Sequence, residues 1–158
     1  MKLRDILKLI IAVLIVELAG VIGGSFTAPA ISNWYSTLSK PALNPPNWIF
    51  APVWTTLYAL MGVAAFLIWR HGLRQRKVRV ALTIFSVQLV LNIFWSIIFF
   101  GFQNPYLAFI EILILWLAII WTILVFYKIS RLAACLLMPY IIWVSFAAYL
   151  NYFIWLLN

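Results

Sequence analysis

The side chains best suited to chemistry in this sequence are aromatic. Nine tryptophans occur in 158 residues, and Trp, Tyr and Phe together make up 18% of the chain. Trp54 stands near the start of one apolar run, Trp95 late in another, and Trp143 midway along the last. If these runs pack as a bundle, rings turned inward near one end form a flat-walled pocket. Stacking on a planar conjugated ligand then adds roughly 0.5–1.5 kcal/mol per ring beyond area burial. Plain core packing of the same rings is the alternative, and the sequence leaves both open.

Polar side chains inside the apolar runs form a second candidate set. Glu17 and Glu111 are carboxylic acids at positions where a charge is costly and often functional. Structural pairing with a polar partner is one interpretation; a proton relay is the other, and it requires a longer chain of titratable groups. Gln88 and Asn92 are four residues apart and therefore share a helix face. These two amides and Asn151 either cross-link helices or orient the polar edge of a ligand.

The sequence contains none of the common sets of catalytic residues. Cys135 is the only cysteine and His71 the only histidine, so we expect no disulfide within the chain and no metal site. There is also no serine elbow and no glycine loop of the kind that binds phosphate. Any catalysis therefore has to come from tryptophan and from the chemistry of a bound ligand.

Composition places these residues in a membrane protein. Hydrophobic residues make up 67% of the chain and its mean hydropathy is +1.10, whereas a soluble domain is nearer 45–50% apolar. Apolar runs of roughly 20 residues can span the hydrocarbon core of a bilayer. We predict an all-α fold, a bundle of five transmembrane helices forming one domain over residues 1–158. The expected spans are about 6–26, 51–69, 78–100, 105–127 and 132–157.

The connection between the first two spans, about residues 27–50, differs from the others. It contains Pro29, Pro41, Pro45 and Pro46, which favour turns and extended segments. Its aromatic and aliphatic residues make it too apolar for a free linker. We expect this long first loop to fold over one end of the bundle as a lid.

The basic residues predict the orientation. With five spans, ten of the 11 Lys and Arg residues fall on the side of the N-terminus, and Lys40 alone falls on the other. This bias predicts a cytoplasmic N-terminus and an external C-terminus, most simply in a bacterial inner membrane. The net charge of +8 is thereby explained by topology, and we expect no nucleic-acid partner.

Two backbone features bear on packing. Gly20 and Gly24 have the G-x-x-x-G spacing that allows helices to approach closely, either between two copies of the chain or within the bundle. Pro139 removes one backbone hydrogen bond from the last span and is expected to kink it beside Tyr140 and Trp143.

Motifs along nearly the whole chain resemble the tryptophan-rich sensory protein family, also called the TspO or translocator protein family. The matching positions are Trp34-Tyr35, Leu38, Lys40-Pro41, Pro45-Pro46, Trp48, Ala51-Pro52-Val53-Trp54, Leu57-Tyr58, Met61-Gly62, Gln88-Leu89, Leu91-Asn92, Trp95, Phe99-Phe100-Gly101, Ala108, Glu111, Leu132-Ala133-Ala134, Pro139-Tyr140, Trp143, Phe146-Ala147 and Leu150-Asn151-Tyr152. Their order and spacing agree with the family pattern. Glu17 does not correspond to a family position.

The resemblance implies a function. Members of the family are membrane receptors or sensors that bind porphyrins such as protoporphyrin IX and similar apolar ligands, often as homodimers, with no resident cofactor. By motif position, Trp54 and Trp143 correspond to tryptophans implicated in light-dependent porphyrin degradation. The ligand-binding positions carried over are Trp54, Tyr58, Asn92, Trp95, Trp143, Ala147 and Leu150. Whether degradation is an enzymatic role of this chain stays open.

Two other functions are weighed against this one. A transporter of porphyrins or other amphipathic molecules is the alternative, and it predicts discontinuous spans and alternating access. A stress-linked scaffold whose pocket is incidental is the third possibility. Sterol binding at the last span is not expected, because no Lys or Arg follows Tyr152.

Overall fold

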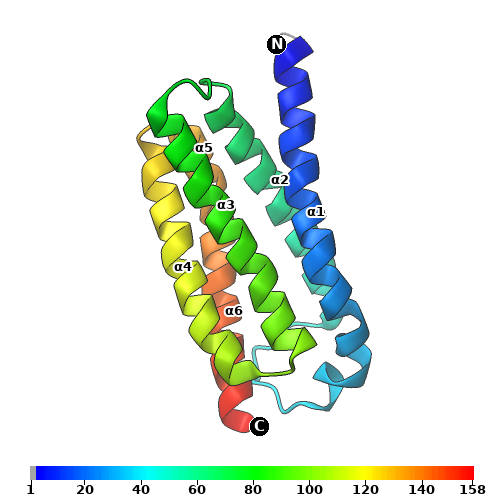
Figure 1. Cartoon of the computed structure of the whole chain (residues 1–158). Helices are drawn as coiled ribbons and strands as arrows, with labels where there is room; N and C mark the ends of the chain where they lie inside the picture. Colours follow the sequence, from blue (N-terminus) through cyan, green and yellow to red (C-terminus); the bar gives the residue numbers. More distant parts are fainter. Residues whose placement is uncertain (1–2) are drawn as a thin grey trace.

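Five apolar helical segments long enough to cross a membrane run side by side in the computed structural model, which describes residues 3–158 (Figure 1). The α-helices are α1 (Leu3–Asn33), α2 (Phe50–Trp69), α3 (Arg76–Ser96), α4 (Pro105–Tyr127), α5 (Arg131–Leu136) and α6 (Met138–Leu157). The last two form one segment, Arg131–Leu157, that crosses the bundle. The predicted five-helix membrane bundle is confirmed. In hydrocarbon a helix is favoured because it satisfies its own backbone polar groups.

Helix α1 is longer than the sequence predicts. Local signals place the end of the first span near residue 26, but the helix continues through Pro29 to Asn33. Proline is tolerated here although it removes one backbone hydrogen bond. Ala30 is buried, so tertiary packing holds these last two turns in place against the local turn signal. The loop therefore begins seven residues later than predicted.

The last membrane-spanning segment is interrupted beside Pro139, where the sequence predicted a kink. Helix α5 ends at Leu136, and α6 begins at Met138 with Pro139 in its first turn. Leu137 between them has φ −88° and ψ −7°, which lies in the bridge region just outside the usual helical range. Tyr140 follows this break and is fully buried in the bundle, with none of its surface exposed.

The α3–α4 connection also departs from regular helix. After Ser96 the chain widens into a π-helical turn, η3 (Ile97–Gly101), in which the Phe102 amide donates to the Ile97 carbonyl at 2.8 Å. Asn104 then caps α4 by accepting from the Leu107 amide at 3.0 Å. Pro105 occupies the first turn of α4, as its fixed φ predicts.

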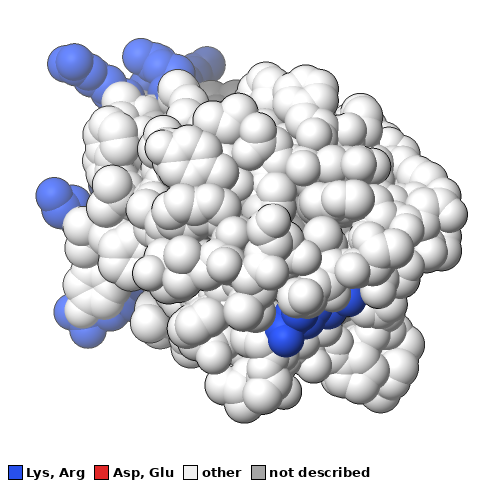
Figure 2. Space-filling view, turned by 90° about the horizontal axis from the view of Figure 1, so that it is seen from below, with Lys and Arg blue, Asp and Glu red and all other residues white. Residues whose placement is uncertain are grey.

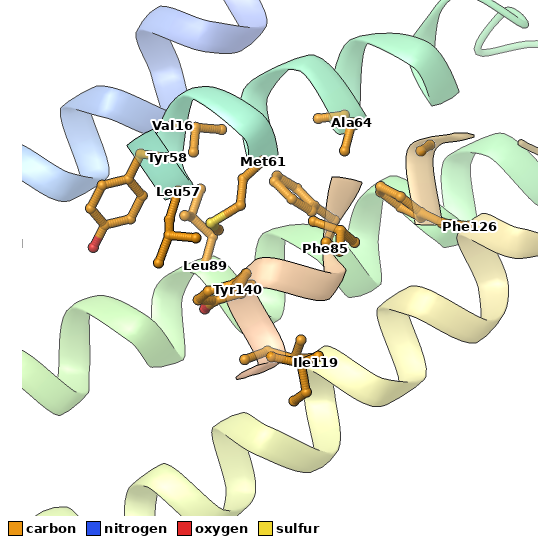
Figure 3. Packing of buried hydrophobic residues seen from close by; sticks show 14 of the residues in the cluster. Val16, Leu57, Tyr58, Met61, Ala64, Phe85, Leu89, Ile119, Phe126 and Tyr140 are labelled. Carbon is orange, nitrogen blue, oxygen red and sulfur yellow. The ribbon is translucent and has the colours of Figure 1, made fainter. Parts of the chain in front are cut away.

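The core fills the half of the bundle that lies toward the basic connections. Met61, Ala64 and Ile68 of α2 are fully buried, and they belong to one cluster with Phe85 and Phe126, whose rings stack at 5.7 Å (Figure 3). Such packing leaves little space inside this part of the molecule.

Two glycines let α1 lie close against α2. A Cβ on Gly62 would lie 2.6 Å from the Cα of Val13, and a Cβ on Gly20 would overlap the ring of Tyr58. A Cβ on Gly24 would meet no atom within 4 Å. The sequence left open whether this glycine pair serves contacts between two copies of the chain or packing within the bundle. Gly20 packs within the bundle.

The connection from Trp34 to Ile49 folds over one end of the bundle, as expected. It contains two one-turn 3₁₀ helices, η1 (Tyr35–Thr37) and η2 (Asn47–Ile49). Tyr35 is buried against Phe99 and donates its hydroxyl to Asn44 Oδ1 at 2.7 Å. The amide side chain of Asn158 bonds both the N–H and the carbonyl of Ser39, at 2.9 and 3.0 Å. The lid is thus joined to the end of α6.

Charge divides between the two ends of the bundle. Among residues 3–158, every Lys and Arg except Lys40 lies in α1 near its start or around the α2–α3 and α4–α5 connections. These connections share the end of the molecule where α1 begins (Figure 1). The opposite end, which carries the lid, is mostly white in the charge-coloured view (Figure 2). This arrangement has the form that the positive-inside bias requires.

We predict that Gly62→Ala lowers the stability of the bundle by about 1–3 kcal/mol, because the added methyl group meets the backbone of α1. The measurement is the midpoint of thermal unfolding in a maltoside detergent. Gly24→Ala is the matched control, since its Cβ has open space, and it should leave the midpoint unchanged or raise it. Equal midpoints for wild type and Gly62→Ala would contradict the close packing of α1 on α2.

We also predict that the C-terminus after Asn158 lies outside the cytoplasm. Alkaline phosphatase fused there should be active in a bacterial host, and green fluorescent protein fused at the same place should be dark. Fusions made after Lys128 should behave in the opposite way. The reverse pattern would show that the basic residues do not set the topology.

Candidate functional site

A cavity of about 320 Å³ lies beneath the lid, between α1, α2, α3 and α6. Tyr35 and Asn47 of the lid contribute to its wall. The α1 side consists mainly of small and aliphatic residues such as Gly20, Gly24 and Ala28, together with Glu17 and Thr27, while the aromatic rings of the lining come from the lid and the other helices. The volume is at the lower end of the range for ligand sites, roughly 300–1,000 Å³.

Most residues expected at a ligand site meet at this cavity. Its lining includes Trp54, Tyr58, Trp95, Trp143, Ala147 and Leu150. They come from three segments of the chain and are separated by up to about a hundred residues in sequence. Asn92 is the exception: it does not line the cavity, but its Oδ1 accepts a hydrogen bond of 2.6 Å from the Tyr58 hydroxyl.

The aromatic rings are arranged in near-parallel pairs. Trp54 and Tyr58 of α2 stack with centroids 5.5 Å apart and planes 27° apart. On another wall, Trp95 of α3 stacks on Phe99 of η3 at 5.3 Å and 24°. Residues one helical turn apart share a face, which explains why each pair is adjacent. These flat surfaces suit an aromatic or conjugated guest.

Several lining residues were not among the predicted site residues. Phe50 packs edge-on against Trp143 at 6.2 Å, and Phe99 and Phe100 of the π-helical turn both approach Tyr35. The motif match included Phe99 and Phe100, but nothing local showed that a π-helical turn places them beside the lid. Burial raises the pKa of the Tyr35 phenol above its ordinary value, so this hydroxyl is neutral and acts as a donor to Asn44.

A buried chain of hydrogen bonds supports the cavity from below. Asn92 Oδ1 accepts a hydrogen bond from the Tyr58 hydroxyl, and Asn92 Nδ2 donates one to the Tyr140 hydroxyl at 3.1 Å. Tyr140 in turn donates to Gln88 Oε1 at 2.9 Å. The chain joins α2, α3 and α6. For Gln88 and Asn92, cross-linking of helices is therefore the role seen in the structure.

A second amide orients Trp95. The indole Nε1 of Trp95 donates to Asn151 Oδ1 at 3.0 Å, and Asn151 Nδ2 donates to the Pro105 carbonyl at 2.7 Å. This fixes one wall of the cavity to α6 and to the start of α4. The Trp95 ring is thus held in position by hydrogen bonding as well as by stacking.

Three side chains carry buried polar atoms with no hydrogen-bond partner among residues 3–158. They are Trp143, with its Nε1, Gln88, with its Nε2, and Glu111, with both carboxyl oxygens. Trp143 lines the cavity, and its indole Nε1 is a buried donor without a partner among these residues. Glu111 lies in α4 outside the cavity lining, and no hydrogen bond among residues 3–158 joins its carboxyl group to another titratable side chain.

We predict that Tyr140→Phe destabilises the protein by about 1–3 kcal/mol, because Asn92 Nδ2 and Gln88 Oε1 each lose a buried partner. Thermal unfolding in detergent measures the change. Tyr149→Phe is the control, since it also removes a phenol hydroxyl from α6 but at an exposed position. A loss of stability no larger than in the control would mean that the buried chain is not a structural tie.

Comparison with known proteins agrees with this arrangement. Residues 12–156 match the model of the TspO/MBR family. The chain is 42% identical over 155 residues to the tryptophan-rich protein TspO of Chlorobaculum tepidum, covering 98% of each chain. It is 44% identical over 154 residues to the protein of the same name from Archaeoglobus fulgidus, covering 98% of this chain and 99% of the relative.

The similarity extends to animals. The translocator protein of Homo sapiens is 38% identical over 135 residues, which cover 85% of this chain and 80% of the human protein. The family match includes the lid and all the segments that line the cavity, since it runs through residues 12–156. With its five-helix architecture and tryptophan-rich cavity, the chain belongs to the TspO/MBR family.

Proposed function

We propose that the protein is a membrane receptor or sensor that binds a porphyrin such as protoporphyrin IX, or a similar flat apolar ligand, in the cavity beneath the lid. Family membership supports the broader role, that of a membrane receptor, sensor or transporter. The observation that carries the finer proposal is the pair of stacked ring sets, Trp54 with Tyr58 and Trp95 with Phe99, on separate walls of one cavity.

The size of the cavity constrains the binding mode. A volume of about 320 Å³ is small for a tetrapyrrole, so only part of the macrocycle is expected inside, among the rings. The carboxylates of protoporphyrin IX would then remain at the mouth. Lys40 of the lid has its Nζ 4.8 Å from the centre of the ring of Tyr35, which lines the cavity, and it is the basic residue suited to pair with them.

Light-dependent degradation is the second part of the proposal. An illuminated porphyrin activates dioxygen, which adds across a bridging carbon–carbon double bond. Cleavage of that bond leaves two carbonyl groups with one oxygen atom on each, so no further reductant is required. Trp54 and Trp143 both line the cavity. Their part would be to hold the macrocycle in one orientation, Trp54 by stacking and Trp143 through its unpartnered N–H.

Transport of porphyrins or other amphipathic molecules is the alternative. The interrupted segments, η3 and the α5–α6 break, favour it because transporters use broken helices. Against it, the bundle below the cavity is filled by the core around Met61, Ile68 and Phe126. A homodimer, which the resemblance implies, stays a prediction that crosslinking in native membranes can test.

The test is a titration of the purified protein with protoporphyrin IX in detergent, followed by quenching of tryptophan fluorescence in the dark and then under light. We expect saturable quenching by wild type in the dark, and loss of the porphyrin absorption band under light. Trp54→Phe and Trp143→Phe keep a ring at each position. They should still bind within a few-fold of wild type while the light-driven loss slows about tenfold or more.

Trp121→Phe is the matched control, because Trp121 is exposed on α4 away from the cavity, and it should behave as wild type. Unchanged photodegradation in both cavity variants would remove the role of these rings. Absence of saturable quenching in wild type would overturn porphyrin binding itself. Movement of porphyrin into proteoliposomes that contain the protein, saturating over the same porphyrin concentrations as binding, would favour the transporter.

A further inference from the structure

Glu17 is an acidic residue in an unusual place. It lies near the middle of α1, inside a membrane-spanning segment, and is neither fully buried nor fully exposed. An ionisable side chain at membrane depth is expensive and commonly marks a functional site. Its side chain lines the cavity.

No other charged residue lines this cavity among residues 3–158. The remaining wall consists of aromatic, aliphatic and small residues with a few neutral polar groups such as Thr27 and Ser96. The other two acids are elsewhere, Asp5 in the first turn of α1 and Glu111 buried in α4. The described part of the chain contains no hydrogen bond or ion pair to Glu17, so nothing in that part neutralises it.

Glu17 lies on the face of α1 that packs against the Tyr58 ring of α2. Glu17 and Gly20 are three residues apart and share a face of α1. Gly20 lies against the Tyr58 ring, which stacks on Trp54. The hydroxyl of Tyr58 is already donated to Asn92, so Tyr58 does not serve as the donor for the carboxyl group. The carboxyl group therefore stands at the edge of an aromatic wall with its capacity to accept hydrogen bonds unused.

An aromatic wall with one carboxylate is the chemistry that binds organic cations. The faces of Trp and Tyr rings attract alkylammonium groups, and this attraction strengthens when water is excluded. A carboxylate beside the rings adds a charge-assisted hydrogen bond to an N–H of the same group. A cation that enters from the lipid phase must also carry an apolar body, which the aliphatic and aromatic walls suit.

We propose that this cavity selects amphipathic organic cations, with the ammonium group beside Glu17 and Tyr58 and an aromatic or aliphatic body among the remaining rings. The inference uses the same cavity as the proposed function but does not depend on porphyrin being a ligand. It also assigns a direction to any porphyrin bound there: its carboxylates are repelled by Glu17 and lie toward the lid.

The test compares two probes that differ in one charge. Dansylcadaverine carries a primary ammonium group, and its N-acetyl derivative has the same aromatic body without the charge. Both accept energy from excited tryptophan, so binding to the full-length protein in a neutral maltoside detergent is read as transfer from the cavity tryptophans. We expect wild type to bind the ammonium probe about tenfold more tightly than the acetylated one. That ratio corresponds to about 1.4 kcal/mol.

The variant Glu17→Gln should reduce affinity for the ammonium probe about tenfold and leave affinity for the acetylated probe within twofold. Asp5→Asn makes the same change of charge on the same helix outside the cavity, and should leave both affinities unchanged. The comparison of the two probes on wild type needs no variant, so it stands even if Glu17→Gln folds poorly.

Equal affinity of wild type for the two probes would overturn the inference, as would an equal loss for both probes in Glu17→Gln. The two proposals fail separately. If protoporphyrin IX binds and the ammonium probe does not, cation selection is wrong and porphyrin binding stands. If the ammonium probe binds with the predicted preference and protoporphyrin IX does not, the cavity is a cation site and the porphyrin proposal falls.

Discussion

The structure depends on a hydrogen-bonded chain placed where water cannot satisfy polar groups. Tyr58, Asn92, Tyr140 and Gln88 join α2, α3 and α6 through contacts of 2.6, 3.1 and 2.9 Å. In an apolar environment each unpaired polar atom costs free energy, so the three helices have few alternative registers in which these groups remain paired. The position of the cavity follows, because Tyr58 is both the first member of the chain and part of the cavity wall.

The space above this chain results from unequal packing along the bundle. Toward the basic connections, large residues such as Phe85, Phe126 and Ile68 fill the interior. Toward the lid, α1 contributes glycine and alanine, and a side chain at Gly24 would have open space around it. At the same end, the π-helical turn η3 interrupts the regular helix after Ser96. A cavity therefore forms at the lid end, and the lid covers it through Tyr35 and the Ser39–Asn158 pair.

Side chains of opposite charge lie on the lid and on the α1 wall of the cavity. Lys40 lies over the Tyr35 ring on the lid, whereas Glu17 lies within the membrane-spanning part of α1. The proposed ligands would therefore meet a positive group on the lid and a negative group on α1. For the porphyrins and amphipathic cations proposed here, this polarity would determine which end of the molecule enters first.

Much of this protein could be predicted from its sequence. Hydropathy and the distribution of Lys and Arg act over single segments, so the five spans, their order and the segregation of charge were predictable. The motif match likewise assigned Trp54, Tyr58, Asn92, Trp95, Trp143, Ala147 and Leu150 to one ligand site, and all of these except Asn92 line the cavity. Tertiary structure alone decided that α1 continues through Pro29 to Asn33, that Asn92 acts through Tyr58, and that Glu17 lines the cavity. Each of these depends on how one helix packs against another, and that information is absent from the pattern within any single helix.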